Sequence, residues 1–290
     1  MNSAVESMLE KYKCKNINDY KNALKEIIQE IVLLGFYKSD FFNIASFYGG
    51  SALRIFHKLN RFSEDLDFSL LKPDNNFKLT PYFSSIGNEL AAYGFETEII
   101  AKEKIVESNV ESAFIKADTL INLLKITSIN PPVLGVHKNE QLKIKFEVDM
   151  NPPLGANYET KYNLNPIPYS VKLYDLPSQF AGKLHSVLCR KWKTRIKGRD
   201  LFDYIWFLSN DISVNIYHLE ERMKQSGHLK KNDVLDNKLL LEKLIDKFEV
   251  IDYKQAIDDV IRFIKNIEQF KLWSKEFFIS ITNEKLRALS

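Results

Sequence analysis

Hydrophobic residues recur along this chain with two different periods, one typical of helices and one typical of strands. Over residues 18–34 they return every three or four positions, which predicts a packing helix that Gly35 would end. A second helix is expected over residues 80–93, where a glycine again follows. Residues 143–150 instead alternate strictly between polar and apolar side chains, which is typical of a strand with one buried face.

Further strands and helices follow from the same two patterns. Strands are expected over residues 96–103, 112–126 and 169–174. Beyond them the pattern is helical, over residues 216–224, 233–248, 253–267 and 274–289. This order favours an α/β (α+β) fold, in which a small mixed β-sheet with flanking helices precedes a C-terminal helical bundle. We therefore expect a sheet-containing domain over residues 1–175 and a helical domain over residues 176–290.

Composition and charge indicate an ordinary soluble protein. The 290 residues are 45% hydrophobic, enough for one substantial core or two smaller ones. The balance of 41 basic against 38 acidic residues is too even to indicate nucleic-acid binding by itself. Cys14 and Cys189 have no Cys-x-x-Cys spacing, so we expect a reducing compartment with neither a disulfide framework nor a zinc site. No apolar run approaches the ~18 residues of a membrane span, and we expect a cytoplasmic protein without membrane contact.

The chemistry gathers in residues 47–71. The turn Gly49-Gly50-Ser51 precedes a short helical pattern, and a helix N-terminus with free backbone N–H groups can hold a phosphate. Asp65 and Asp67 follow in a segment that alternates like a strand, so both carboxylates would share one face. Paired carboxylates suit Mg²⁺. Taken alone, however, the turn also fits a loop with a helix cap at Ser51, and the acids also fit a polar strand face.

A third carboxylate is expected from the strand at residues 143–150, where Lys145, Glu147 and Asp149 share one face. Either acid could join Asp65 and Asp67 in a two-metal site. The alternative is a solvated amphipathic strand without a metal.

A basic segment supplies the positive charge that the overall balance lacks. Residues 183–199 contain no acid and seven basic residues: Lys183, Arg190, Lys191, Lys193, Arg195, Lys197 and Arg199. Such a run suits the phosphates of RNA. Asp200 and Asp203 follow at once, and they could either hold a lysine by ion pairing or complement a helix dipole.

These motifs together resemble the AbiEii/AbiGii toxin-like nucleotidyltransferases, a branch of the DNA polymerase β-like superfamily that includes the MenT toxins. The family pattern is a Gly-Gly-Ser/Thr turn, a short helix and Arg-x-Ser-x-Asp-hydrophobic-Asp, matched here by Gly49, Gly50, Ser51, Arg61, Ser63, Asp65 and Asp67. Its Lys-x-Asp/Glu element resembles residues 145–147, which favours Glu147 as the third acid with Asp149 as its neighbour. Its helical lysine and Lys-Gly-Arg-Asp-Leu-aromatic-Asp string resemble Lys183 and residues 197–203.

The resemblance implies a nucleotidyltransferase that uses an NTP and two Mg²⁺ ions. It implies a metal site of Asp65, Asp67, Glu147 and Asp149, and a catalytic set of Asp65, Asp67, Lys183 and Asp200. The residues expected to contact the nucleotide are Gly49, Gly50, Ser51, Arg61, Ser63, Lys145 and Arg199.

The resemblance further implies a toxin that adds nucleotides to the 3′ end of tRNA and is held in check by a cognate antitoxin. Two alternatives stay open. One is nucleotidyl or phosphoryl transfer to a protein hydroxyl, and the other is a catalytically silent module that binds a nucleotide or a partner protein.

Overall fold

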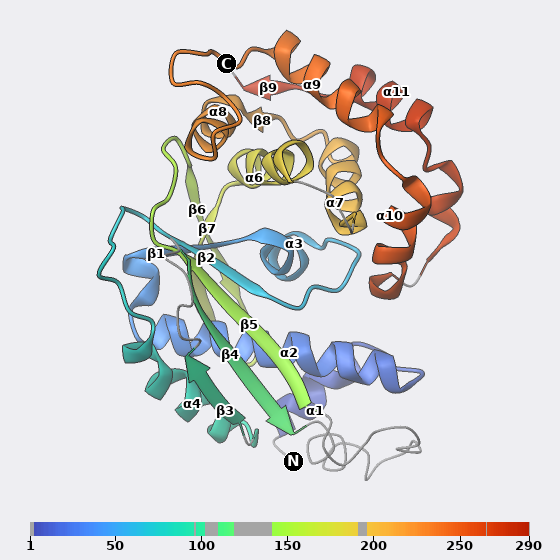
Figure 1. Ribbon diagram of the computed structural model, residues 1–290. Coiled ribbons are helices and arrows are strands. Elements are labelled where there is room, and N and C mark those ends of the chain that lie inside the picture. The colour runs from blue at the N-terminus through green and yellow to red at the C-terminus, as the bar shows by residue number, and fades with distance from the viewer. Residues whose placement is uncertain are drawn as a thin grey trace. The chain divides into compact units, whose positions relative to one another are not determined.

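The computed structural model describes residues 3–95, 97–101, 110–118, 141–190, 196–264 and 266–289 (Figure 1). The chain divides into two compact units. The first, called the sheet unit, comprises Met1–Lys58, Phe62–Pro152 and Thr160–Leu173. The second, called the helical unit, comprises Leu59–Arg61, Pro153–Glu159 and Tyr174–Ser290. Residues 119–126, where the sequence predicts part of a strand, lie outside the described residues.

A seven-stranded mixed sheet has the strand order β3-β4-β5-β2-β1-β7-β6. The strands are β1 (Ala45–Tyr48), β2 (Leu66–Leu70), β3 (Thr97–Ala101), β4 (Val110–Asp118), β5 (Gln141–Asp149), β6 (Tyr158–Asn163) and β7 (Tyr169–Tyr174). Strand β2 pairs antiparallel with β1 and parallel with β5, and β1 pairs parallel with β7. The predicted mixed α/β fold is thereby confirmed, and β6, whose residues the pattern did not indicate, completes one edge.

The central strands are held by one buried face. Leu66, Phe68 and Leu70 of β2 are buried, and Phe146 and Val148 of β5 are fully buried beside them. Burying a side chain of this size stabilises the fold by roughly 1.5–3 kcal/mol. Because side chains alternate along a strand, the intervening acids of β2 and β5 must point to the opposite face.

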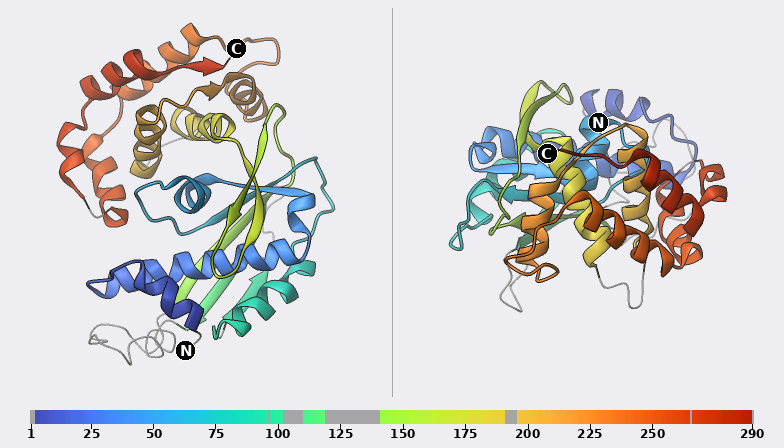
Figure 2. Two further views of the ribbon diagram at one scale, coloured as in Figure 1. Left: turned by 180° about the vertical axis from the view of Figure 1, so that it is seen from behind. Right: turned by 90° about the horizontal axis from the view of Figure 1, so that it is seen from above.

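Helix α2 (Ile17–Lys38) packs against α4 (Phe83–Ala92) and β5 on one face of the sheet (Figure 1 and Figure 2). It begins at Asn16, whose side chain accepts a hydrogen bond from the backbone N–H of Asp19. The prediction that Gly35 ends this helix is wrong, since the helix continues to Lys38. A Cβ at Gly35 would lie 2.8 Å from the Cα of Ile86, so the glycine instead permits the close approach of α4.

Among the described residues, the other elements of the sheet unit are short helices: α1 (Ser3–Glu10), α3 (Gly49–His57), and the 3₁₀ helices η1 (Phe41–Asn43) and η2 (Thr80–Tyr82). A 3₁₀ turn thus opens the second predicted helix, and Gly94, with a φ of 83°, follows α4.

The helical unit surrounds an aromatic core. Its helices are α6 (Leu176–Cys189), α7 (Gly198–Ser209), α8 (Ile216–Gln225), α9 (Asn237–Glu249), α10 (Tyr253–Val260), α11 (Lys275–Lys285), η3 (Ile261–Phe263) and η4 (Glu268–Leu272). Phe180 of α6 stacks on Phe207 of α7 with ring centroids 4.6 Å apart, and the hydroxyls of Tyr204 and Thr282 lie 2.6 Å apart.

Two of the predicted C-terminal helices are shorter than expected. The helix expected over residues 253–267 ends at Val260, and that expected over residues 274–289 ends at Lys285. After the second of these, β9 (Ala288–Leu289) pairs parallel with β8 (Val214–Asn215). Within the ranges that the structure describes, no helix combines the length and apolarity that a membrane span requires.

Candidate active site

The turn from β1 into α3 brings a helix N-terminus beside a carboxylate. Gly49 opens α3 with a φ of 83°, a conformation that strains any residue with a side chain. A Cβ added at Gly49 would lie 2.5 Å from Oδ2 of Asp67. This position therefore requires glycine for two reasons, its backbone angle and the closeness of the Asp67 carboxylate. No side-chain hydrogen bond from Tyr48 caps this helix end.

Ser51 fastens the loop that precedes β2. The residue is fully buried, and its hydroxyl donates a short hydrogen bond to the backbone carbonyl oxygen of Asp65. The hydroxyl is thus engaged by the protein, so a phosphate contact at Ser51 would use the backbone N–H at the start of α3. Gly50 is buried beside it.

The register of β2 and β5 decides which acids are neighbours. Asp67 lies opposite Glu147, and Ser69 lies opposite Asp149. Paired residues of neighbouring strands point to the same face, so Asp67 and Glu147 stand side by side. Asp149 lies beside Ser69, which is buried, and its carboxylate accepts a hydrogen bond of 3.0 Å from the backbone N–H of Asn151. The pairing favours Glu147 over Asp149 as the neighbour of Asp67.

The carboxylates lie on a half-buried face together with one lysine. Asp65, directly before β2, and Asp67 are half-buried. Lys145, two residues before Glu147 on β5, makes a short ion pair with it. In the part of the chain that the structure describes, no three acids bring one oxygen each within 4.8 Å of one another. The Lys145 ammonium balances the charge of Glu147, so chelation of one ion by all three acids would require Glu147 to turn from Lys145.

A second charged cluster lies inside the helical unit. Nζ of Lys183, on α6, lies 2.8 Å from Oδ1 of Asp200 and 2.7 Å from Oδ2 of Asp203, both on α7. Arg61 donates two hydrogen bonds of 2.6 Å to Asp203. Arg190 lies 3.2 Å from the second oxygen of Asp200. The pair of Arg61 with Asp203 is bidentate, and bidentate arginine–carboxylate pairs are among the strongest hydrogen bonds in proteins.

Electrostatics keep this cluster ionised. Burial opposes the charge on Lys183, but Asp200 and Asp203 outweigh it and raise the pKa of the ammonium above its ordinary value. Burial likewise opposes the charge on Asp200 and Asp203, but Lys183 with Arg190 or Arg61 outweighs it and lowers the pKa of each carboxyl. Lys183, Asp200 and Asp203 are therefore charged at neutral pH.

Three residues expected to contact the nucleotide have other contacts in the structure. Arg61 is buried, with its guanidinium on Asp203. The guanidinium of Arg199 lies over the ring of Phe263, 4.4 Å from its centroid. The backbone carbonyl oxygen of Ser63 accepts a 3.0 Å hydrogen bond from Nε2 of Gln29.

Sequence reasoning left Asp203 out of the expected catalytic set, although it is the centre of the cluster. The signal was its spacing of three residues from Asp200, which places both carboxylates on one face of a helix. Gly198, in the same string, is the first residue of α7. A Cβ there would overlap the backbone carbonyl oxygen of Ala256 on α10, so the glycine permits the two helices to pack closely.

A family described as Nucleotidyl transferase AbiEii toxin, Type IV TA system, matches residues 31–277 of this sequence. The chain belongs to this AbiEii family. The match confirms the resemblance given by the motifs, and the AbiEii-family chain is a nucleotidyltransferase of a type IV toxin–antitoxin family. Enzymes of this kind generally use an NTP and a divalent metal, and the family suggests a cognate antitoxin.

Two solved structures are similar to the AbiEii-family chain. One is a candidate nucleotidyltransferase from H. pylori, with 17% identity and a TM-score of 0.48, covering 89% of this chain and 91% of that one. The other is JHP933 from Helicobacter pylori, with 17% identity and a TM-score of 0.48, covering 91% of this chain and 90% of that one. No curated protein matches.

Proposed function

We propose that this AbiEii-family enzyme transfers a nucleoside monophosphate from an NTP to an RNA acceptor in a reaction that depends on Mg²⁺. The proposal is carried by one observation: Asp67 lies opposite Glu147 in the sheet and beside the N-terminus of α3 at Gly49. A carboxylate face next to a helix N-terminus joins the two features that a bound metal–triphosphate needs, hard oxygen ligands and backbone N–H donors.

The residues fit divalent ions by their chemistry. Asp65, Asp67 and Glu147 offer only oxygen donors from a half-buried face, and Asp149 is a further acid two residue pairs along the strands. When bound, Mg²⁺ would supply Lewis acidity to the phosphates and to the attacking hydroxyl. Lys145 would then exchange its contact with Glu147 for one with the nucleotide phosphates.

The proposed reaction joins the acceptor hydroxyl oxygen to the α-phosphorus and breaks the bond from that phosphorus to the α,β-bridging oxygen. Pyrophosphate leaves with the electron pair of the broken bond, and the hydroxyl proton passes to a carboxylate or to solvent. The backbone N–H groups at Gly50 and Ser51 would hold the phosphate tail. Lys183, kept charged by Asp200 and Asp203, is proposed to neutralise the departing pyrophosphate.

The proposal of an RNA acceptor rests on the positive charge of one segment of the chain. The basic segment 183–199 suits an RNA backbone, and tRNA is the acceptor that the family resemblance favours. Residues 191–195 of this segment lie outside the described residues, and Lys183 and Arg190 are ion-paired within the cluster. The cognate antitoxin is proposed as the protein that restrains this activity.

The deciding experiment incubates the purified enzyme with Mg²⁺, total RNA and each α-labelled NTP in turn. Label in a tRNA-sized band that Asp67→Asn abolishes is the expected result. Label on protein would redirect the proposal to a protein hydroxyl, and label transferred from a γ-labelled but not an α-labelled NTP would establish phosphoryl transfer. Absence of label in every arm would overturn enzymatic transfer to these acceptors.

A further inference from the structure

Away from the candidate active site, three side chains with metal-binding atoms converge inside the helical unit. His185, Cys189 and His228 each bring one such atom within 4.8 Å of the other two. Among the described residues, this is the set of three His, Cys, Asp or Glu side chains that meets the distance. His185 and Cys189 are one turn apart on α6, and His228 follows the C-terminal end of α8.

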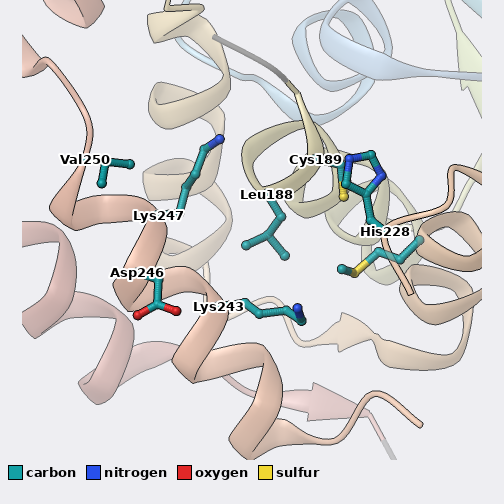
Figure 3. A pocket seen from close by; sticks show the side chains of 8 residues that line it. Leu188, Cys189, His228, Lys243, Asp246, Lys247 and Val250 are labelled. Carbon is teal, nitrogen blue, oxygen red and sulfur yellow. The ribbon is translucent and has the colours of Figure 1, made fainter. Parts of the chain in front are cut away.

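The two imidazoles point at one oxygen atom. Nε2 of His185 lies 2.8 Å from the hydroxyl oxygen of Ser226, and Nδ1 of His228 lies 2.9 Å from the same oxygen. Cys189 is 8% exposed, and Figure 3 shows its sulfur beside the His228 ring. The three metal-binding side chains therefore already converge on one point, which the Ser226 hydroxyl occupies.

This point opens on a cavity. The cavity has a volume of about 300 Å³, and its lining includes Cys189, His228, Lys243, Asp246 and Lys247 (Figure 3). Cys189 and His228 thus form part of its wall. A fourth ligand could reach the three donors from this side, and the lysines would favour an anionic one.

The donor set selects the kind of ion. Two imidazole nitrogens and one sulfur suit a borderline-soft ion such as Zn²⁺, whereas Mg²⁺ and Ca²⁺ prefer oxygen. With Zn–N of about 2.0–2.1 Å and Zn–S of about 2.3 Å, tetrahedral ligand atoms lie about 3.3–3.6 Å apart. The 4.8 Å limit therefore asks for movements of roughly 1 Å, which side-chain rotation supplies, the more easily because His228 is exposed.

We propose that His185, Cys189 and His228 form a site for a transition-metal ion of the Zn²⁺ class. The ion takes three protein ligands, and the Ser226 hydroxyl or a molecule in the cavity takes the fourth position. Binding replaces the thiol proton of Cys189, which passes to solvent. The ion cross-links α6 to the segment after α8. The expectation of no zinc site rested on Cys-x-x-Cys spacing, and these ligands come from positions up to 43 residues apart in sequence.

The test uses the full chain without Mg²⁺ or NTP, so it does not depend on nucleotidyl transfer. Zn²⁺ is titrated against a chromophoric chelator, and Co²⁺ is added separately as a spectroscopic probe. We expect one ion per chain and a thiolate-to-Co²⁺ charge-transfer band. Loss of an outer-shell partner costs about 10–100-fold in metal affinity, so Cys189→Ser and His228→Asn, which remove ligands, should each cost at least about 100-fold.

The matched control is Cys14→Ser, because Cys14 is the other cysteine of the chain and belongs to the sheet unit. It should keep the affinity and the cobalt spectrum of the unaltered protein. Zn²⁺ should also raise the melting temperature of the unaltered protein and of Cys14→Ser, but not that of His228→Asn. Absence of binding at micromolar Zn²⁺, or binding that survives both ligand substitutions, would overturn the proposal.

Discussion

Replacing Asp203 by Asn changes one buried charge and very little volume, so its effect on stability can be estimated from the structure. The side chain is fully buried and faces Arg61 through two hydrogen bonds of 2.6 Å and Lys183 at 2.7 Å. In Asp203→Asn the Arg61 guanidinium loses this carboxylate, whereas Lys183 keeps Asp200 at 2.8 Å. We expect the free energy of unfolding to fall by about 3–5 kcal/mol, the usual result of removing one partner of a buried ion pair.

A double variant separates the attraction between Arg61 and Asp203 from the cost of leaving one of these charges buried without the other. Arg61→Met alone removes the strongest partner of Asp203, and Arg61→Met with Asp203→Asn removes both charges together. Because the second change no longer strands a charge, the double variant should lose about 2 kcal/mol less than the sum of the single variants.

Unfolding in urea can be followed by tryptophan fluorescence. All three tryptophans, Trp192, Trp206 and Trp273, lie beyond residue 175, in the same part of the chain as Asp203. Asp211→Asn serves as the control, since this exposed residue pairs with Lys285 at 3.3 Å, and it should leave the midpoint almost unchanged. A loss below about 1 kcal/mol for Asp203→Asn, or strict additivity in the double variant, would refute the assignment of a coupled buried cluster.

Three further predictions concern the sheet face, the Gly49 turn and a buried histidine. Glu147→Gln should lower nucleotidyl transfer more than about 100-fold while Asp149→Asn lowers it far less, measured by label incorporation, and equal losses would contradict the strand register. Gly49→Ala should destabilise by about 1–2 kcal/mol and reduce activity, because its methyl meets the neighbouring carboxylate. Gly227→Ala, also at positive φ but in open space, should show the backbone strain without the loss of activity, and an inactive Gly227→Ala would undo the comparison. Burial lowers the pKa of His218 from 6.5 to about 4, so the unfolded chain takes up the proton first and stability falls as the pH drops from 6.5 towards 4, by about 3 kcal/mol. His218→Gln should make this part of the stability–pH curve less steep, although His57 and His185 are shifted in the same way and keep part of the slope, and an unchanged slope would exclude His218 as one of its sources.

The acids show how far the sequence could predict the site. Strict alternation along residues 143–150 indicated which side chains share a face, because that information is local. The choice between Glu147 and Asp149 needed the pairing of β2 with β5, two strands about 80 residues apart, and no local pattern sets that register. The structure pairs Glu147 with Asp67, and the role of Glu147 as the third metal ligand stays a prediction.

For other residues the local sequence was not enough, because their contacts depend on packing between distant segments. Gly35 matched the signal for a helix end, but the approach of α4 decides its role. Arg61 matched a family motif, while its carboxylate partner lies 142 residues away on α7. His228 carries no spacing signal relative to Cys189, since the fold rather than the sequence brings them together.

Arg61 also bears on how this toxin could be divided. Residues Leu59–Arg61 belong to the helical unit, although they sit in the chain between the Gly-Gly-Ser turn and the paired acids of the sheet unit. A gene fragment ending near residue 175 would retain Arg61 and discard Asp203, so the Arg61 guanidinium would lose the carboxylate that neutralises it. The two units are therefore poor candidates for exchange between related toxins, and a recombination that keeps the enzyme intact must inherit both of these residues together.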